Sequence, residues 1–174
     1  YNAGEAMLTG DKELAYKVIS RERRVNAFEL KIDSDCEDII ALYAPVAIDL
    51  RFVLAMYKIN TNLERLGDFA ESIARFAGNL PEGEPIDPQL VKETRVEEML
   101  SELLSMISLT KEAFEKESSE IASRIFLKDN LIDEINHNST AIIAKYIEEH
   151  KGSALAGLYM AGVIRKMERF GDHC

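Results

Sequence analysis

The stretch Leu63-Glu64-Arg65-Leu66-Gly67-Asp68 recurs almost unchanged as Met167-Glu168-Arg169-Phe170-Gly171-Asp172. Glu and Asp four positions apart lie on one face of a helix, one turn above the other, so both carboxylates can reach a single cation. The like charges destabilise a helix by about 0.2 to 0.5 kcal/mol unless something positive neutralises them. The glycine between them costs about 1 kcal/mol relative to alanine. Because both penalties occur twice, at equal positions, the motif predicts a functional role.

The repetition extends well beyond this motif. Residues 56–68 align with residues 160–172 at a shift of 104 positions (64 to 168). Residues 5–28 align with residues 112–135 at a shift of 107 (5 to 112). The shift changes in the turn between helices, where a change in length costs little. The two halves of the chain are therefore predicted to be copies of one fold.

Apolar residues follow helical spacing on both sides of the motif. They recur at alternating steps of four and three, which is typical of a helix packed in a bundle. The members of this seam are Phe52, Met56, Ile59, Leu63, Leu66, Ala70, Ile73 and Ala77. A preceding helix is predicted from Asp11, as N-cap, to a point before Pro45. Its core residues are expected to be Leu14, Val18, Val25, Phe28, Ile32 and Ile39.

Proline and glycine cluster between Gly78 and Pro88, which is typical of a linker, with Asp87 as N-cap and Pro88 at the first helical position. No alternating pattern indicates a strand. We expect an all-α fold of two tandem three-helix bundles, at residues 1–78 and 88–174, joined by a linker at 79–87. One larger bundle is the alternative. The expected helices of the second half are 88–117, 119–150 and 152 onward, and both ends of the chain are expected to cut through helices.

The acidic motif is interpreted as a metal site on the outer surface of each bundle. The preceding helix of each half also carries two oxygen-bearing side chains four positions apart. If the two helices lie side by side, they would gather four oxygen ligands per half. Such ligands suit Fe, Mn, Mg or Ca, with Zn possible. The predicted ligands are Glu22, Asn26, Glu64 and Asp68 in the first half and Asp129, Asp133, Glu168 and Asp172 in the second.

The two predicted sites are not equivalent, because the amide of Asn26 is a weaker ligand than a carboxylate. His137, one turn beyond Asp133, could join the second site. His150 and His173 are interpreted as surface or packing residues. Acidic residues on a solvated helix face can also serve solubility alone, so a metal-free surface stays open as an alternative.

Charge and composition exclude some functions. The formal net charge is −10, from 21 basic and 31 acidic residues, which opposes nucleic-acid binding because such binding depends on Lys and Arg. No apolar run reaches the length of a membrane span and the first residues do not resemble a signal peptide, so we expect a soluble, cytoplasmic protein. Cys36 and Cys174 are expected to be reduced, inert thiols.

At these residues the chain resembles the PhoU family of phosphate-uptake regulators. The resemblance covers nearly the whole chain. It rests on Gly10-Asp11, on Pro45-Val46-Ala47-Ile48-Asp49-Leu50-Arg51, and on the two ER-x-GD motifs, the second followed by His173. It implies two three-helix bundles with multinuclear iron or zinc clusters held by E/D-xxx-D motifs. Glu22 with Asn26 departs from that pattern, which puts the first cluster's nuclearity in doubt.

The resemblance also implies a role. It is that of a cytoplasmic negative regulator, without enzymatic activity, which connects the phosphate ABC transporter to its sensor histidine kinase. The implied partners are the transporter's ATPase subunit and the kinase; a homodimer is expected, and membrane association only through partners. A carboxylate-bridged di-iron enzyme is one alternative, but the sequence offers a single Glu-x-x-His spacing, Glu134 to His137. A metal-free helical scaffold is the other.

Overall fold

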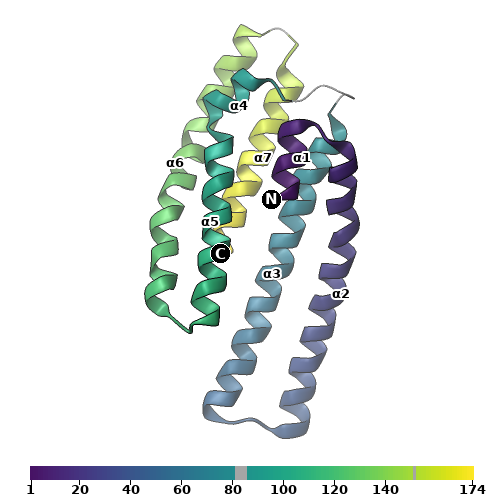
Figure 1. The fold of residues 1–174 in the computed structure, drawn as a ribbon, viewed down its shortest axis with the longest axis vertical. Helices are drawn as coiled ribbons and strands as arrows, with labels where there is room; N and C mark the ends of the chain where they lie inside the picture. Colours follow the sequence, from purple (N-terminus) through teal and green to yellow (C-terminus); the bar gives the residue numbers. More distant parts are fainter. Residues whose placement is uncertain (81–85, 151) are drawn as a thin grey trace.

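The computed structural model describes residues 1–80, 86–150 and 152–174. These residues form helices joined by turns and no strand, which confirms the predicted all-α class (Figure 1). The helices are α1 (Asn2–Thr9), α2 (Lys12–Tyr43), α3 (Ala47–Asn79), α4 (Pro88–Thr94), α5 (Val96–Glu115), α6 (Ser119–Glu149) and α7 (Ala154–Asp172).

The helix ends follow the capping chemistry of the sequence. The side chain of Asp11 accepts a hydrogen bond of 2.9 Å from the backbone N–H of Leu14 and starts α2. Asp87 caps α4 in the same way, by accepting 2.8 Å from the N–H of Gln89. Helix α2 ends at Tyr43, before Pro45, as predicted.

One predicted helix is divided in two. The pattern predicts a single helix over 88–117, but Arg95 adopts a left-handed conformation (φ 56°) and separates α4 from α5. The Arg95 guanidinium forms ion pairs of 2.7 Å with Glu98 and with Glu134 of α6. The contact with Glu134 reaches another helix, and spacing along the chain does not reveal it.

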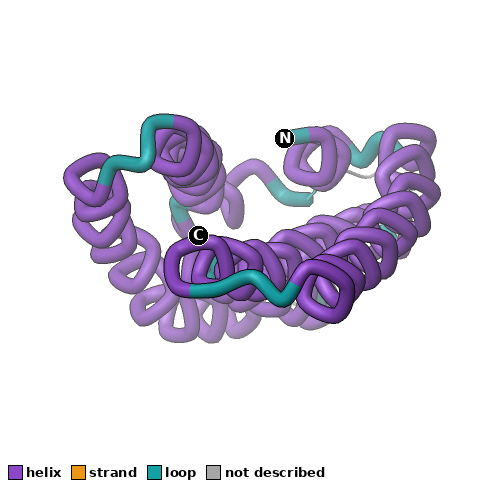
Figure 2. Tube along the Cα trace, turned by 90° about the horizontal axis from the view of Figure 1, so that it is seen from below, coloured by secondary structure: helices purple, strands orange, loops and turns teal. Residues whose placement is uncertain are grey.

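The helices of each half pack together, and the two halves lie side by side. Helices α2 and α3 form a long antiparallel hairpin that α1 joins, while α4 and α5 pack on α6 and α7. The turns that join α2 to α3 and α5 to α6 lie at the same end of the molecule (Figures 1 and 2). Helices α3 and α7 run antiparallel and in contact, and a single hydrophobic core runs through both halves. Residues 81–85 of the predicted linker lie outside the described residues.

The apolar seam of α3 is only partly buried. Ile73 and Ala77 belong to the core, whereas Leu63 is 52% exposed. Together with Ile32, Met56 and other apolar residues, Leu63 lines a groove of about 500 Å³. The prediction that the whole seam faces a core is therefore wrong for this part of α3.

The repeat explains this difference. The counterpart of Leu63 is Met167, which is fully buried in the core that includes Met99 and Leu103 of α5. Helix α5 has 20 residues, whereas its counterpart α1 has 8, so α1 covers only one end of the corresponding face.

Candidate metal centre

The predicted ligands of the second half come from two packed helices. Helix α6 supplies Asp129 and Asp133, and α7 supplies Glu168 and Asp172. Gly171 lets the helices approach, because a Cβ atom at this position would lie 3.3 Å from Cδ1 of Ile132 and 3.4 Å from Oδ1 of Asp129. The glycine therefore eases the packing of α7 against Ile132 and lies in contact range of the Asp129 carboxylate.

The electrostatics show that these four carboxylates act on one another. Burial raises the pKa of Asp129, and the charges of Asp133 and Asp172 raise it further. Burial likewise raises the pKa of Glu168, with Asp172, Asp133 and Asp129 adding to the effect and Arg169 opposing it. The structure thus brings together the four residues that the sequence singles out. Asp133 and Asp172 are exposed, whereas Asp129 and Glu168 are half-buried, so the cluster lies at the surface with one side against the packed helices.

The cluster has the chemistry of a cation site. Its four side chains offer only oxygen, which suits hard cations. Oδ1 of Asp129 is buried and receives no hydrogen bond from any described residue. A buried acceptor without a partner is costly, and a cation would satisfy it. Nevertheless, within 1–80, 86–150 and 152–174 no three His, Cys, Asp or Glu side chains are already gathered around one ion position.

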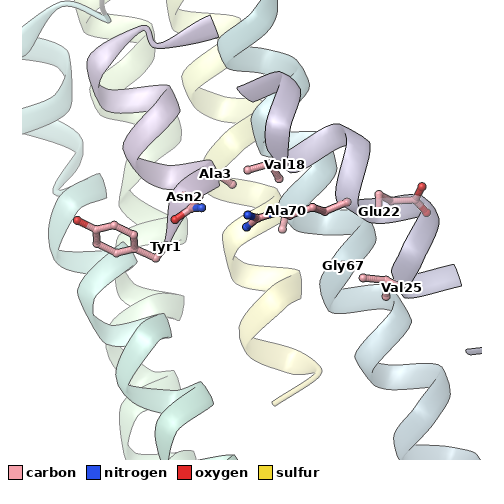
Figure 3. A pocket seen from close by; sticks show the side chains of 9 residues that line it. Tyr1, Asn2, Ala3, Val18, Glu22, Val25, Gly67 and Ala70 are labelled. Carbon is pink, nitrogen blue, oxygen red and sulfur yellow. The ribbon is translucent and has the colours of Figure 1, made fainter. Parts of the chain in front are cut away.

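The first half repeats the backbone arrangement. A Cβ atom on Gly67 would lie 3.1 Å from Cγ1 of Val25, which is the counterpart of Ile132 (Figure 3). Burial raises the pKa of Glu64, and Asp68 and then Glu29 add to this effect. Glu29 was not among the predicted ligands.

The repeat itself explains why Glu29 was missed. Its counterpart at the shift of 107 is Asn136, so a search for repeated acidic positions passes over it. The available signal was its spacing: Glu29 lies seven residues after Glu22, two turns along the same face of α2.

Glu22 and Asn26 have different surroundings from those of their counterparts. Glu22 lines a pocket of about 280 Å³ together with Gly67 and Ala70 (Figure 3). The ion pair with Glu71, at 2.7 Å, raises the pKa of Arg75, and the charge of Glu22 adds a smaller contribution. Asn26 is half-buried on α2. The first-half residues therefore form a mixed cluster, with Arg75 close to Glu22.

The histidines and the Glu-x-x-His spacing lie outside these clusters. Glu134 is ion-paired with Arg95 and His137 is exposed, so this pair does not point into the bundle as a di-iron enzyme requires. His150 stacks on Tyr146 with ring centroids 4.4 Å apart, and His173 stacks on Phe69 at 5.6 Å. Both histidines thus have packing contacts.

Both cysteines are free thiols. Cys36 is buried, and burial raises its pKa. Burial also raises the pKa of Cys174 to about 11. Both thiols are therefore protonated near neutral pH, which fits the expected inert role. None of the described helices has the length and apolar character needed to cross a bilayer.

Comparison with known proteins gives consistent matches. The family model described as the PhoU domain matches residues 2–77 and again residues 96–174. A "Phosphate-specific transport system accessory protein PhoU homolog" from Burkholderia sp is 31% identical over 172 residues, covering 99% of this chain and 73% of that protein. The "Phosphate-specific transport system accessory protein PhoU" of Escherichia coli (strain K12) is 33% identical, covering 97% of this chain and 68% of that protein.

Solved structures agree with the sequence matches. The crystal structure of PhoU from Pseudomonas aeruginosa superimposes with a TM-score of 0.91 at 28% identity, covering 99% of this chain and 81% of that one. The phosphate transport system regulatory protein PhoU from Streptococcus pneumoniae gives a TM-score of 0.84 at 28% identity, covering 99% and 80%. With a family model that matches both halves and relatives above 30% identity along nearly all its length, this chain belongs to the PhoU family.

Proposed function

We propose that this chain is an accessory protein that regulates phosphate transport through contacts with other proteins and carries metal cations on its carboxylate clusters. The observation that carries the regulatory part is the family match over both halves, together with relatives named as accessory proteins of the phosphate-specific transport system. The net charge of −10 supports action through proteins rather than through DNA.

The proposed partners are the ATPase subunit of the phosphate ABC transporter and the phosphate-sensing histidine kinase. In this proposal the protein acts in the cytoplasm, as a homodimer, and reaches the membrane only through its partners. When phosphate is plentiful, it connects transporter to kinase and keeps the starvation response off. No enzymatic step is needed for this role.

The metal part of the proposal rests on the cluster between α6 and α7. The unsatisfied Oδ1 of Asp129 and the mutual repulsion around Glu168 support it. Asp129, Asp133, Glu168 and Asp172 would hold the cation, which would neutralise their charges and tie α6 to α7. Because the donor atoms are not yet gathered, their side chains would close on the ion through rotamer changes. The family resemblance favours iron or zinc; the oxygen ligands also suit Mn, Mg or Ca.

The metal content of purified protein tests this part. The protein is prepared without metal-affinity steps, and bound metal is measured by elemental analysis in the parent, Asp133→Asn and Asp172→Asn. Both variants should lose most of the metal. Glu148→Gln is the matched control, since Glu148 is exposed on the same helix as Asp133 and the substitution removes the same charge. Metal retained in full by both variants would refute the ligand assignment.

The regulatory part has a separate test. The full-length protein is used as bait for the purified ATPase subunit and for the kinase, at high and low phosphate. Binding to both at high phosphate supports the proposal. Binding to neither refutes it, whatever the metal content. If the parent protein binds both the ATPase subunit and the kinase but contains no metal, the result would indicate the metal-free scaffold instead.

A further inference from the structure

The apolar groove of about 500 Å³ runs between α2, α3 and the C-terminal part of α5. Its apolar side chains on α2 and α3 include Ile32, Ile39, Ile59 and Leu63. These four side chains are 36% to 52% exposed. Among the described residues, no helix covers this apolar surface of the first half.

The equivalent surface of the second half is covered. At the shifts of 107 for α2 and 104 for α3, the counterparts of these four residues are Ser139, Tyr146, Val163 and Met167. All four counterparts are 4% exposed or less. The three apolar ones belong to one core with Leu90 of α4 and Met99 of α5. Helices α4 and α5 thus bury in the second half what stays exposed in the first.

Helix α1 is the counterpart of only the last part of α5. At the shift of 107, Tyr1 corresponds to Ser108, so α4 and Val96–Ile107 have no counterpart in residues 1–80. Helix α1 packs on α2 and α3 near the upper end of their hairpin, and the hairpin continues well below the N-terminus of α1 (Figure 1). A helix that extended α1 backwards from Tyr1 would lie along the groove, as Val96–Ile107 lies along α6 and α7.

We propose that a helical segment on the N-terminal side of Tyr1, continuous with α1, occupies this groove. Its expected length is that of α4 and Val96–Ile107 together. It is amphipathic, and its apolar residues recur at steps of four and three, as Met99, Leu103 and Met106 do in α5. The family relatives described above are longer than this chain and so leave room for such a segment.

This occupant has a consequence for function. The first half would have a complete third helix, like the second half, and Ile59 and Leu63 would be core residues rather than surface residues. The groove would then be closed to the transport partners, which would bind elsewhere on the molecule. A second copy of the chain, or a separate protein, is the competing occupant.

Photo-cross-linking in the full-length protein identifies the occupant. Phe114 of α5 lines the groove and is half-exposed, so p-benzoylphenylalanine can replace it with little change in shape. The same replacement of Phe126, which is exposed on α6 outside the groove, is the matched control. Mass spectrometry should find a cross-link from position 114 to the segment before Tyr1 of the same chain, and none from position 126. Cross-links from position 114 to a second copy, or only to α2 and α3, would overturn the proposal.

Thiol labelling of the full-length protein is the second measurement. Leu63→Cys is compared with Leu54→Cys on the same helix, since Leu54 is 48% exposed, lies outside the groove, and has an exposed counterpart in Leu158. A maleimide should label position 63 about tenfold more slowly than position 54, because it reaches position 63 only when the covering helix opens. Equal rates at the two positions would overturn the proposal. Neither measurement depends on whether the protein binds metal.

Discussion

Oδ1 of Asp129 is buried against Gly171, 3.4 Å from the point where a Cβ atom would project. A Cβ atom at position 171 would only touch this oxygen at ordinary van der Waals distance, and its tighter contact would be with Cδ1 of Ile132, at 3.3 Å. The oxygen has no hydrogen-bond partner among the described residues, and burial, followed by the charges of Asp133 and Asp172, raises the pKa of its carboxyl group. The glycine of the acidic motif therefore lies where α6 and α7 pack closely, next to a buried carboxylate oxygen that has no partner.

Replacing Asp129 with Asn should separate repulsion from metal binding. Without metal, the variant should be as stable as the parent or more stable by about 0.5 kcal/mol, since one like charge is removed. With metal at 100 times its Kd, the parent should gain about 2.7 kcal/mol and the variant much less. Thermal unfolding followed by circular dichroism, in EDTA and in excess Mn²⁺, measures both effects. Equal Mn²⁺ stabilisation in variant and parent would contradict the assignment.

The stability of the metal-free protein should depend on pH through the same cluster. The pKa values of Asp129 and Glu168 are raised above their ordinary values of 3.8 and 4.5. The folded state therefore holds protons that the unfolded state releases. The contribution of these groups to stability is fully present below pH 3.8 to 4.5 and is lost as the pH rises through the raised pKa values. Urea unfolding in EDTA between about pH 4 and 7 measures this.

The double variant Asp129→Asn/Glu168→Gln provides the comparison for this pH dependence. It should gain stability relative to the parent as the pH rises from about 4 to 7, because it has no cluster charge to develop at these positions. A difference between the two proteins that stays constant over this range would show that the cluster does not titrate abnormally.

The hydroxyl of Tyr146 donates a hydrogen bond of 2.5 Å to the carboxylate of Asp87, which also caps α4. Tyr146→Phe should destabilise the protein by about 1.5 to 3 kcal/mol, the range for hydrogen bonds to charged groups. The bond from Tyr146 lowers the pKa of Asp87, so its stabilisation is present above pH 3.8 and is lost as the pH falls through the lowered pKa. Urea unfolding at pH 7 tests the loss, with Tyr16→Phe at an exposed position as the control. A Tyr146→Phe protein as stable as this control would show that the bond contributes nothing.

Gly157→Ala should destabilise the protein even though alanine favours helices. Its Cβ would lie 2.7 Å from Cδ1 and 2.8 Å from Cγ1 of Ile147, so this side chain, which packs against the core, must shift. Overpacking costs about 1 to 3 kcal/mol, and the gain in helix propensity returns up to about 1 kcal/mol. Gly78→Ala is the matched helical control, since nothing lies within 4 Å of its Cβ position. It should be neutral or stabilising, and a Gly157→Ala protein that melts above it would contradict the packing.

Much of the fold follows from local sequence signals. Asp11 and Asp87 mark helix starts through their own side chains, and Pro45 ends α2 because it cannot continue the helix. The break at Arg95 was not predictable in this way. At the break Arg95 pairs with Glu134, 39 residues away, and nothing in the spacing of apolar residues indicates that pairing.

In the candidate site, too, some residues could be identified from the sequence and others only from the packing of the helices. Asp129, Asp133, Glu168 and Asp172 were identified because the motif is repeated, and the packing of α6 on α7 brings them together. Glu29 was missed because its influence on Glu64 depends on how α2 lies against α3. Repetition finds what both halves share, whereas Glu29 belongs to one half alone.

By itself, the sequence determined the all-α class, the helix starts at Asp11 and Asp87 and the end of α2 before Pro45, because each depends on residues within a few turns of one another, and comparison of the two halves determined the duplication. Only the tertiary structure decided which part of the α3 seam is covered, which charges meet across helices, and that Asn62 reaches His173. These outcomes depend on how whole helices pack. Packing sums many weak contacts between residues far apart in the chain, and local periodicity does not encode that sum.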